Sequence, residues 1–210
     1  LLSRRVPLLA KVCPWLARPF VRQSLRRLTK NMLTVADIQA QMTLALKKLL
    51  DTTTDGYSFS GLDKLDSSKA YLFMSNHRDI SLDPALVCLG LVMAEHQTAR
   101  LAIGDNLLSK PFASDLMRVN RSFIVKRSAS SRREKLEALK VLSRYIRYSI
   151  NTERVSIWIA QAEGRAKDGW DRTETALLKM LSLSKGERQD FAAATGELNL
   201  IPVSISYEYD

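Results

Sequence analysis

The sequence predicts an α/β fold: a largely parallel sheet flanked by helices, with an N-terminal amphipathic helical pair. Two observations support this prediction. From Gly61 onward, short apolar runs alternate with segments of helical periodicity, the pattern of parallel strands joined by helices. Before Gly61, two helical patterns are followed by a polar break at residues 51–61. We therefore expect a helical segment over residues 1–60 and an α/β domain over residues 61–210.

The first expected helix is basic, since residues 1–33 contain no acidic residue. Arg22, Arg26 and Lys30 share one of its faces. Its apolar face comprises Val21, Leu25, Leu28 and Met32. A basic amphipathic helix can lie in a membrane interface with its cations toward anionic lipid. It can equally pack on its own domain with the basic face in water, and the pattern alone leaves both possibilities open.

The remaining elements follow from periodicity and from cap signals. The second helix of the pair is expected at 34–50, with Thr34 and Asp37 as a weak capping signal. The expected strands of the α/β domain cover residues 70–75, 100–103, 122–125, 155–160 and 198–206. The expected helices cover residues 84–95, 131–150 and 173–183. Ser131 with Glu134 forms a capping box, and Asp171 with Glu174 a looser version. Pro202 has no N–H, which predicts an edge position or a bulge for the last strand.

Composition narrows the class of partner. The 210 residues carry a net charge of +10, so we expect anionic partners: nucleic acid, phosphorylated metabolites or an acidic membrane surface. Nucleic acid is disfavoured, because no binding motif is found and the cations are not interleaved with aromatic residues. Cys13 and Cys88 lack metal-type spacing and indicate a reducing compartment without a disulfide framework. No apolar run approaches the ~18 residues of a membrane-spanning helix.

The residues NHRDISLDP (76–84) lie between an expected buried strand and an expected helix. An imidazole beside a carboxylate is the minimal set of groups for removing a proton from a hydroxyl. His77 is therefore a candidate general base, with Asp79 or Asp83 as the supporting acid. We expect Asp83 to be the N-cap of the following helix, with Pro84 in its first turn. The alternative is that His77 merely packs the turn; catalysis needs an accessible ring and a carboxylate within hydrogen-bonding reach.

Two further stretches could bind a phosphate group. NRSFIVKR (120–127) is a strand pattern that ends in Lys126 and Arg127. QAEGRAKDG (161–169) follows another strand and brings together Glu163, Gly164 and Arg165. Arginine can bind a phosphate through two hydrogen bonds, and glycine lets backbone N–H groups approach a ligand. Each stretch on its own could also be an ordinary charged surface loop.

Taken in order, these stretches resemble the glycerolipid acyltransferase family, which acylates glycerol-3-phosphate and lysophosphatidic acid. That family shows an N-H-x4-D block, a strand ending F-I-x-R, an E-G-x-R block and a late V/I-P-V/I strand. The counterparts over roughly residues 70–206 are Asn76-His77 with Asp83, Ile124-Val125-Lys126-Arg127, Glu163-Gly164-Arg165 and Ile201-Pro202-Val203. Five residues rather than four separate His77 from Asp83. Arg121 and Ser122 replace glycines of the family pattern, and E-G-R lacks one residue of E-G-x-R.

The resemblance implies an enzyme of phospholipid biosynthesis that transfers a fatty acyl group from acyl-CoA or acyl carrier protein. The acceptor would be the hydroxyl of 1-acylglycerol-3-phosphate (lysophosphatidic acid), with glycerol-3-phosphate as the alternative. His77 would be the general base with support from Asp83, and backbone N–H groups near the turn could stabilise the oxyanion. The residues implied to bind substrate are Asn76, Arg78, Arg127, Glu163, Gly164 and Arg165. No cofactor and no metal is implied.

The resemblance also implies a location. Residues 1–60 would dock the protein on an anionic membrane as a peripheral protein. The cysteine usage and the basic surface indicate the cytoplasmic face of the inner membrane. Residues 61–210 would form the acyltransferase domain, and we expect the natural chain to continue past Asp210. A different class of protein stays possible on the sequence alone: a non-catalytic basic protein that binds membranes or nucleic acid.

Overall fold

The computed structural model describes residues 32–105, 119–166 and 168–208, together with positions 19, 22–24, 26, 27, 30 and 117. The chain divides into two compact units, Leu1–Leu44 and Ala45–Asp210. This division precedes the boundary at residue 60 that the sequence suggested. Most of the basic helix expected within residues 1–33 lies outside the described residues.

Helix α4 (Val35–Thr53) corresponds to the second helix of the expected pair. The weak capping signal before it proves to be a reciprocal capping box. The Oγ1 of Thr34 accepts the N–H of Asp37 at 3.1 Å, and Oδ2 of Asp37 accepts the N–H of Thr34 at 2.8 Å. In the part of the chain that the structure describes, no helix has the length and apolar character needed to cross a bilayer.

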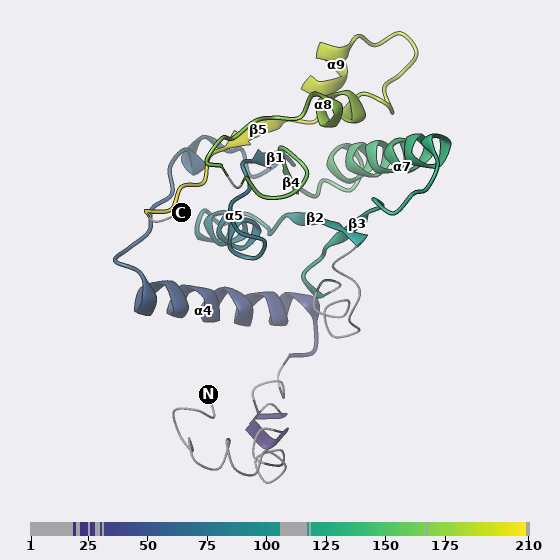
Figure 1. Cartoon of the computed structure of the whole chain (residues 1–210). Helices are drawn as coiled ribbons and strands as arrows, with labels where there is room; N and C mark the ends of the chain where they lie inside the picture. Colours follow the sequence, from purple (N-terminus) through teal and green to yellow (C-terminus); the bar gives the residue numbers. More distant parts are fainter. Residues whose placement is uncertain are drawn as a thin grey trace. The chain divides into compact units, whose positions relative to one another are not determined.

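Five strands in the described residues form one parallel sheet in the order β3-β2-β4-β1-β5 (Figure 1). They are β1 (Leu72–Ser75), β2 (Arg100–Gly104), β3 (Phe123–Val125), β4 (Ile157–Ala160) and β5 (Leu200–Val203). Each expected strand is present, four of them with shorter ends and β2 with one additional residue, so the predicted α/β class is confirmed. Pro202 lies in β5 at the edge of the sheet, where its missing N–H breaks no ladder on the outer side.

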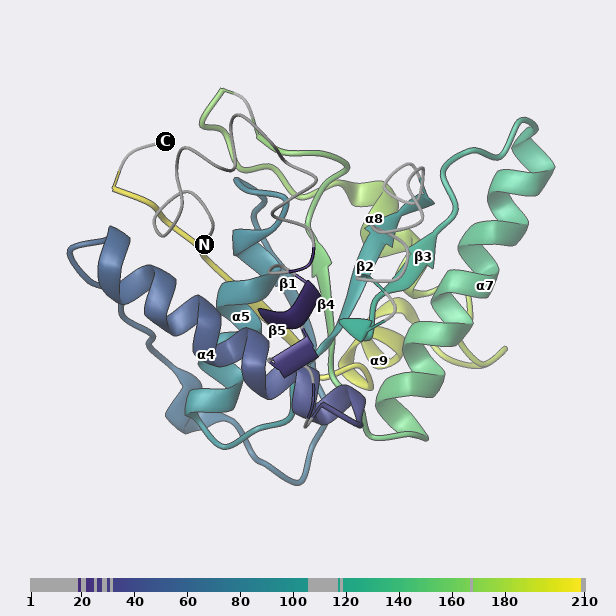
Figure 2. The same ribbon diagram turned by 90° about the horizontal axis from the view of Figure 1, so that it is seen from below.

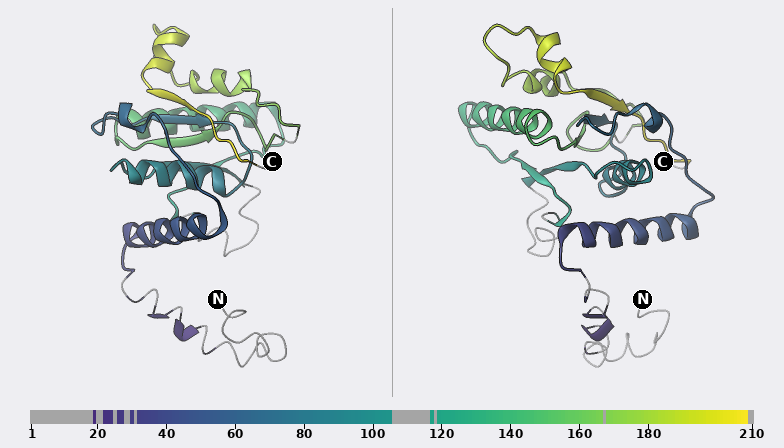
Figure 3. Two further views of the ribbon diagram at one scale, coloured as in Figure 1. Left: turned by 90° about the vertical axis from the view of Figure 1, so that its left-hand side faces the viewer. Right: turned by 180° about the vertical axis from the view of Figure 1, so that it is seen from behind.

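Helices cover both faces of this sheet. Helix α5 (Leu82–Met93) lies on one face, and α7 (Arg132–Asn151) and α8 (Thr175–Leu181) lie on the other (Figure 2, Figure 3). The side chains of β1 alternate between the two cores: Phe73 packs toward α5, whereas Leu72 and Met74 pack toward α7 and α8. Because both faces are buried, the strands appear in the sequence as continuous apolar runs.

The three helices expected in the α/β domain are present. Of the two capping boxes predicted in this domain, one is confirmed and one is wrong. Oγ of Ser131 accepts the N–H of Glu134 at 3.1 Å, which confirms Ser131 as the N-cap of α7. The looser box before α8 is wrong: Glu174, not Asp171, precedes that helix. The short η1 (Leu62–Lys64) and α9 (Phe191–Gly196) were not expected.

The parallel arrangement brings the carboxyl ends of the strands to one edge of the sheet. β1 leads from this edge into residues 76–81, β3 into Lys126 and Arg127, and β4 into the loop of residues 161–174. The segments that the sequence singled out for chemistry therefore emerge at the same edge.

Candidate active site

The turn after β1 leads into α5, and the start of this helix differs from the sequence prediction. Oδ1 of Asp79 accepts the N–H groups of Ser81 at 2.8 Å and Leu82 at 2.7 Å. The expectation that Asp83 is the N-cap is therefore wrong, because α5 begins at Leu82 and Asp83 lies in its first turn. Side chains in a helix tilt toward its N-terminus, and the carboxylate of Asp83 accordingly reaches back to the turn. Pro84 also lies in the first turn, as predicted, where backbone N–H groups have no partner within the helix.

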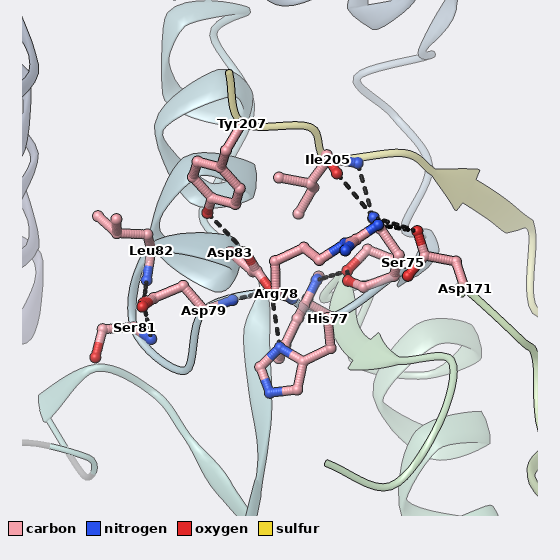
Figure 4. Close-up of polar contacts among 12 residues, drawn as sticks. Ser75, His77, Arg78, Asp79, Ser81, Leu82, Asp83, Asp171, Ile205 and Tyr207 are labelled. Atoms are coloured by element: carbon pink, nitrogen blue, oxygen red, sulfur yellow. Dashed lines mark hydrogen bonds and ion pairs between the residues drawn. The ribbon is translucent and has the colours of Figure 1, made fainter. Parts of the chain in front are cut away.

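The carboxylate of Asp83 is the centre of the site (Figure 4). Its Oδ2 lies 2.8 Å from Nδ1 of His77 and accepts the backbone N–H groups of Arg78 at 2.6 Å and Asp79 at 3.0 Å. Its Oδ1 accepts the hydroxyl of Tyr207 at 2.7 Å. The side chain is fully buried, and this burial raises its pKa. The hydrogen bonds from two side chains and two backbone groups outweigh burial, so the pKa of Asp83 lies below its ordinary value.

The ionised carboxylate fixes the tautomer of His77. Because Asp83 can only accept, Nδ1 of His77 carries the hydrogen and Nε2 presents a lone pair. Figure 4 shows this second nitrogen pointing away from the carboxylate. No described residue forms a hydrogen bond with Nε2, and the side chain of His77 is 15% exposed. The side chain of His77 thus keeps some exposed surface, and its Nε2 lone pair is directed away from Asp83.

Trp158 of β4 supports the imidazole from the side. The two rings meet edge to face, with centroids 5.9 Å apart and planes at 70°. The indole N–H of Trp158 donates to Oγ of Ser75 at 3.0 Å, and that hydroxyl donates to the backbone oxygen of Asn76 at 2.7 Å. The strand end and the position of His77 are thereby tied to the core of the sheet.

Asn76 and Arg78 connect the turn to two other segments. The buried amide of Asn76 donates to the oxygen of Ile205 at 2.7 Å and to Oδ2 of Asp171 at 3.1 Å, and it accepts the N–H of Ile205 at 2.8 Å. The guanidinium of Arg78 donates to the same Asp171 oxygen at 3.0 Å and to the backbone oxygen of Gly169 at 3.3 Å. The amide of Asn76 and Nη2 of Arg78 are therefore engaged within the protein. Asp171 makes these contacts and does not cap α8.

The stretches predicted to bind phosphate meet across the edge of the sheet. Nη1 of Arg127 lies 3.4 Å from Oε1 of Glu163, and the two side chains are 38% and 65% exposed. Gly164 follows with a left-handed backbone (φ 81°), and Arg165 is exposed. The N–H of Ala166 donates to the backbone oxygen of His77 at 2.9 Å, which joins this loop to the turn. The structure thus gathers the residues singled out for acid-base chemistry and those singled out for phosphate around one edge.

Comparison with known protein families decides what this site belongs to. A family model described as Acyltransferase matches residues 57–206. The chain belongs to this acyltransferase family. The glycerolipid acyltransferase family predicted from the order of the motifs is thereby confirmed, and acyl transfer is its general chemistry. No curated protein and no solved structure gave a significant match.

The acyltransferase accommodates its five-residue spacing between His77 and Asp83 within the turn. Oδ1 of Asp79 instead accepts the N–H groups of Ser81 and Leu82 at the start of α5. Asp83 reaches His77 from inside the helix at 2.8 Å. Of the two acids that the sequence offered, the structure places Asp83 beside His77.

Sequence reasoning missed three residues of this acyltransferase site. Tyr207 follows the last strand with no local pattern that would relate it to Asp83. Asp171 was assigned to a cap because it stands three residues before Glu174. Trp158 is indistinguishable from a core residue in an apolar strand.

A groove of about 460 Å³ lies elsewhere, between β3 and α7 of the acyltransferase. Its apolar lining includes Phe123, Ile124, Val141 and Tyr145, and none of its lining residues belongs to the turn at 76–81. In the described part of the chain, no group of His, Cys, Asp and Glu is arranged to bind a metal ion.

Proposed function

We propose that this acyltransferase moves a fatty acyl group from a thioester donor to the free hydroxyl of 1-acylglycerol-3-phosphate. The observation that carries the proposal is the pair formed by the partly exposed His77 and the ionised, buried Asp83, with Nε2 of His77 pointing away from the carboxylate. A neutral imidazole in this tautomer can take a proton from an alcohol, and the carboxylate then stabilises the imidazolium. Glycerol-3-phosphate presents a similar hydroxyl near a phosphate and is the alternative acceptor.

The proposed reaction balances without a covalent enzyme intermediate. The acceptor hydroxyl gives its proton to Nε2 of His77 as its oxygen attacks the thioester carbon. The tetrahedral intermediate collapses, the carbon–sulfur bond breaks, and the imidazolium returns the proton to the departing thiolate. The products are an ester and a free thiol of coenzyme A or of acyl carrier protein. Holding the alcohol beside the thioester supplies much of the acceleration.

The oxyanion that forms on the thioester oxygen needs donors from outside the backbone of residues 78 and 79. The N–H groups of Arg78 and Asp79 both donate to Asp83. Our expectation that backbone groups near the turn stabilise the oxyanion therefore does not extend to these two groups. They serve the carboxylate instead.

We assign the acceptor phosphate to Arg127 and Arg165 and an acceptor hydroxyl to Glu163. Both arginines are exposed at the edge where His77 emerges, and Gly164 leaves open space beside its backbone. The ion pair between Arg127 and Glu163 is partly exposed, so a phosphate can exchange for the carboxylate at low cost. Asn76 and Arg78, by contrast, hold the turn against the segments around Ile205 and Asp171.

The proposal is tested with the purified full chain. Acyl-CoA and acyl carrier protein thioesters are each incubated with lysophosphatidic acid and with glycerol-3-phosphate, and the lipid products are analysed. We expect His77→Ala to abolish product formation. His96→Ala is the matched control, because His96 is the second of the two histidines and lies outside the turn. Unchanged turnover by His77→Ala would refute the mechanism. If product forms only with glycerol-3-phosphate, that compound and not lysophosphatidic acid is the acceptor.

We also propose that residues 1–33 dock the enzyme on an anionic bilayer from its cytoplasmic side. The support is the run of cations without an acid and the insolubility of the expected product. Deletion of residues 1–33 should abolish sedimentation with vesicles that contain anionic lipid. Binding that persists at moderate salt after the deletion would contradict this assignment.

A further inference from the structure

We propose that Tyr207 is a positioning residue for the catalytic pair: its hydroxyl holds the carboxylate of Asp83 in the orientation that aims Nε2 of His77 at the acceptor. This inference rests on the proposed function, since it assumes that His77 is the base. Figure 4 shows Tyr207 and His77 reaching the carboxylate from different sides.

The contacts divide between the two oxygens of Asp83. Oδ2 is bound by Nδ1 of His77 and by two backbone N–H groups of the turn. Among described residues, Tyr207 is the donor to Oδ1, at 2.7 Å. Asp83 has no exposed surface, so solvent cannot readily replace a lost donor. Without the tyrosine hydroxyl, one oxygen of a buried charge would lack its partner, and rotation of the carboxylate would weaken the bond to His77.

The segment that carries Tyr207 is fixed independently of Asp83. β5 pairs with β1 so that Val203 lies opposite Ser75, the last residue before the turn. Two residues further, the amide of Asn76 binds both the N–H and the oxygen of Ile205, at 2.8 and 2.7 Å. The backbone is thus held on the turn just before Tyr207. Because its backbone is held in place, Tyr207 can determine the orientation of the Asp83 carboxylate through its hydroxyl.

The hydroxyl of Tyr207 also helps to keep Asp83 ionised beside His77. Its donation stabilises the anion of Asp83, together with His77 and the N–H groups of the turn. The other charged groups nearby are engaged elsewhere: Asp79 with the start of α5, and Arg78 with Asp171. When the hydroxyl is removed, the carboxylate becomes a stronger base. The hydrogen-bonded pair of Asp83 and His77 should then retain its added proton up to a higher pH.

Tyr207→Phe keeps the aromatic ring and removes only the donor. We expect kcat to fall about 10- to 100-fold, the effect of one hydrogen bond to a charged group. The KM values for donor and acceptor should stay within about twofold, because the tyrosine is proposed to touch neither. The acid limb of the kcat/KM profile should move to higher pH. Incorporation of 3-fluorotyrosine at position 207 retains a hydroxyl and should restore kcat.

Tyr71→Phe is the matched control. The hydroxyl of Tyr71 accepts the N–H of Asp66 at 2.7 Å, at the opposite end of β1 from the turn. Its loss should lower thermal stability and leave kcat and the pH profile unchanged. A Tyr207→Phe variant that behaves in the same way would reduce Tyr207 to a structural role and overturn the proposal.

A second readout does not need activity. In protein labelled with ¹³C at aspartate carboxyl carbons, the Asp83 signal is assigned by its absence in Asp83→Asn. The pKa of Asp83 should rise in Tyr207→Phe and not in Tyr71→Phe; an unchanged pKa would overturn the proposal. If the wild-type protein acylates neither acceptor, the proposed function fails. If the wild type is active and Tyr207→Phe matches it in kcat and in pH profile, only the present inference fails.

Discussion

Asp83→Asn removes the charge from the centre of the acyltransferase site and keeps the size of the side chain. From described residues the carboxylate accepts three hydrogen bonds at Oδ2 and one at Oδ1. An asparagine oxygen turned toward the turn can accept the same three. Its NH2 group then faces Tyr207, whose hydroxyl can reverse and accept. The fold should therefore survive, and the principal loss is the negative charge beside His77.

The expected loss of rate follows from the distance within the pair. Nδ1 of His77 and Oδ2 of Asp83 are 2.8 Å apart, which puts the centres of the imidazolium and carboxylate charges about 4 Å apart. At an effective dielectric constant of about 20, the attraction between two unit charges at that distance is about 4 kcal/mol. Each 1.4 kcal/mol, roughly, changes a rate tenfold, so kcat should fall by about 10³.

The assay measures release of free thiol from the acyl donor at neutral pH with both substrates saturating. Asp79→Asn is the matched control, because asparagine caps a helix about as well as aspartate and Asp79 contacts the start of α5. Its kcat should stay within about twofold of wild type. The reasoning fails if folded Asp83→Asn keeps most of the wild-type kcat, or if Asp79→Asn is the more damaging change.

Three further outcomes are expected. Arg127→Gln should raise the KM for the phosphorylated acceptor about tenfold while changing stability by less than about 1 kcal/mol, since its ion pair with Glu163 is partly exposed; the exposed Arg188→Gln is the control, and an equal effect there would remove the phosphate assignment. Ser131→Ala should lower the free energy of unfolding by about 1 kcal/mol through loss of the α7 cap, with kcat unchanged, as chemical denaturation and the thiol assay can show. Burial raises the pKa of Cys88 to about 11, so alkylation of Cys88 in the folded protein should be slow in mildly alkaline buffer and fast in denaturant when its peptide is followed by mass spectrometry; rapid labelling of Cys88 in the folded chain would contradict this burial.

The sequence predicted the elements because their signals are local. A buried strand is a short apolar run, and a helix shows its period within three turns. The N-cap at Ser131 needs only a hydroxyl and an N–H three residues apart. The error at Asp83 has the same origin: Asp83 is a good cap residue, and whether it caps the helix depends on where the backbone leaves the turn. The structure has Ser81 as the N-cap residue, with the N–H groups of Ser81 and Leu82 bound by Asp79.

By itself the sequence determined the α/β class, the family and the candidate base His77, through apolar runs and the order of four short motifs. Only the tertiary structure decided which acid contacts that histidine and which residues surround the acid. Tyr207 lies 124 positions from Asp83, and Asp171 lies 95 positions from Asn76. Those contacts exist because β5 and β4 both pair with β1 and deliver their following segments to its end. Contacts of that kind depend on strand order and register, which no local pattern of residues specifies.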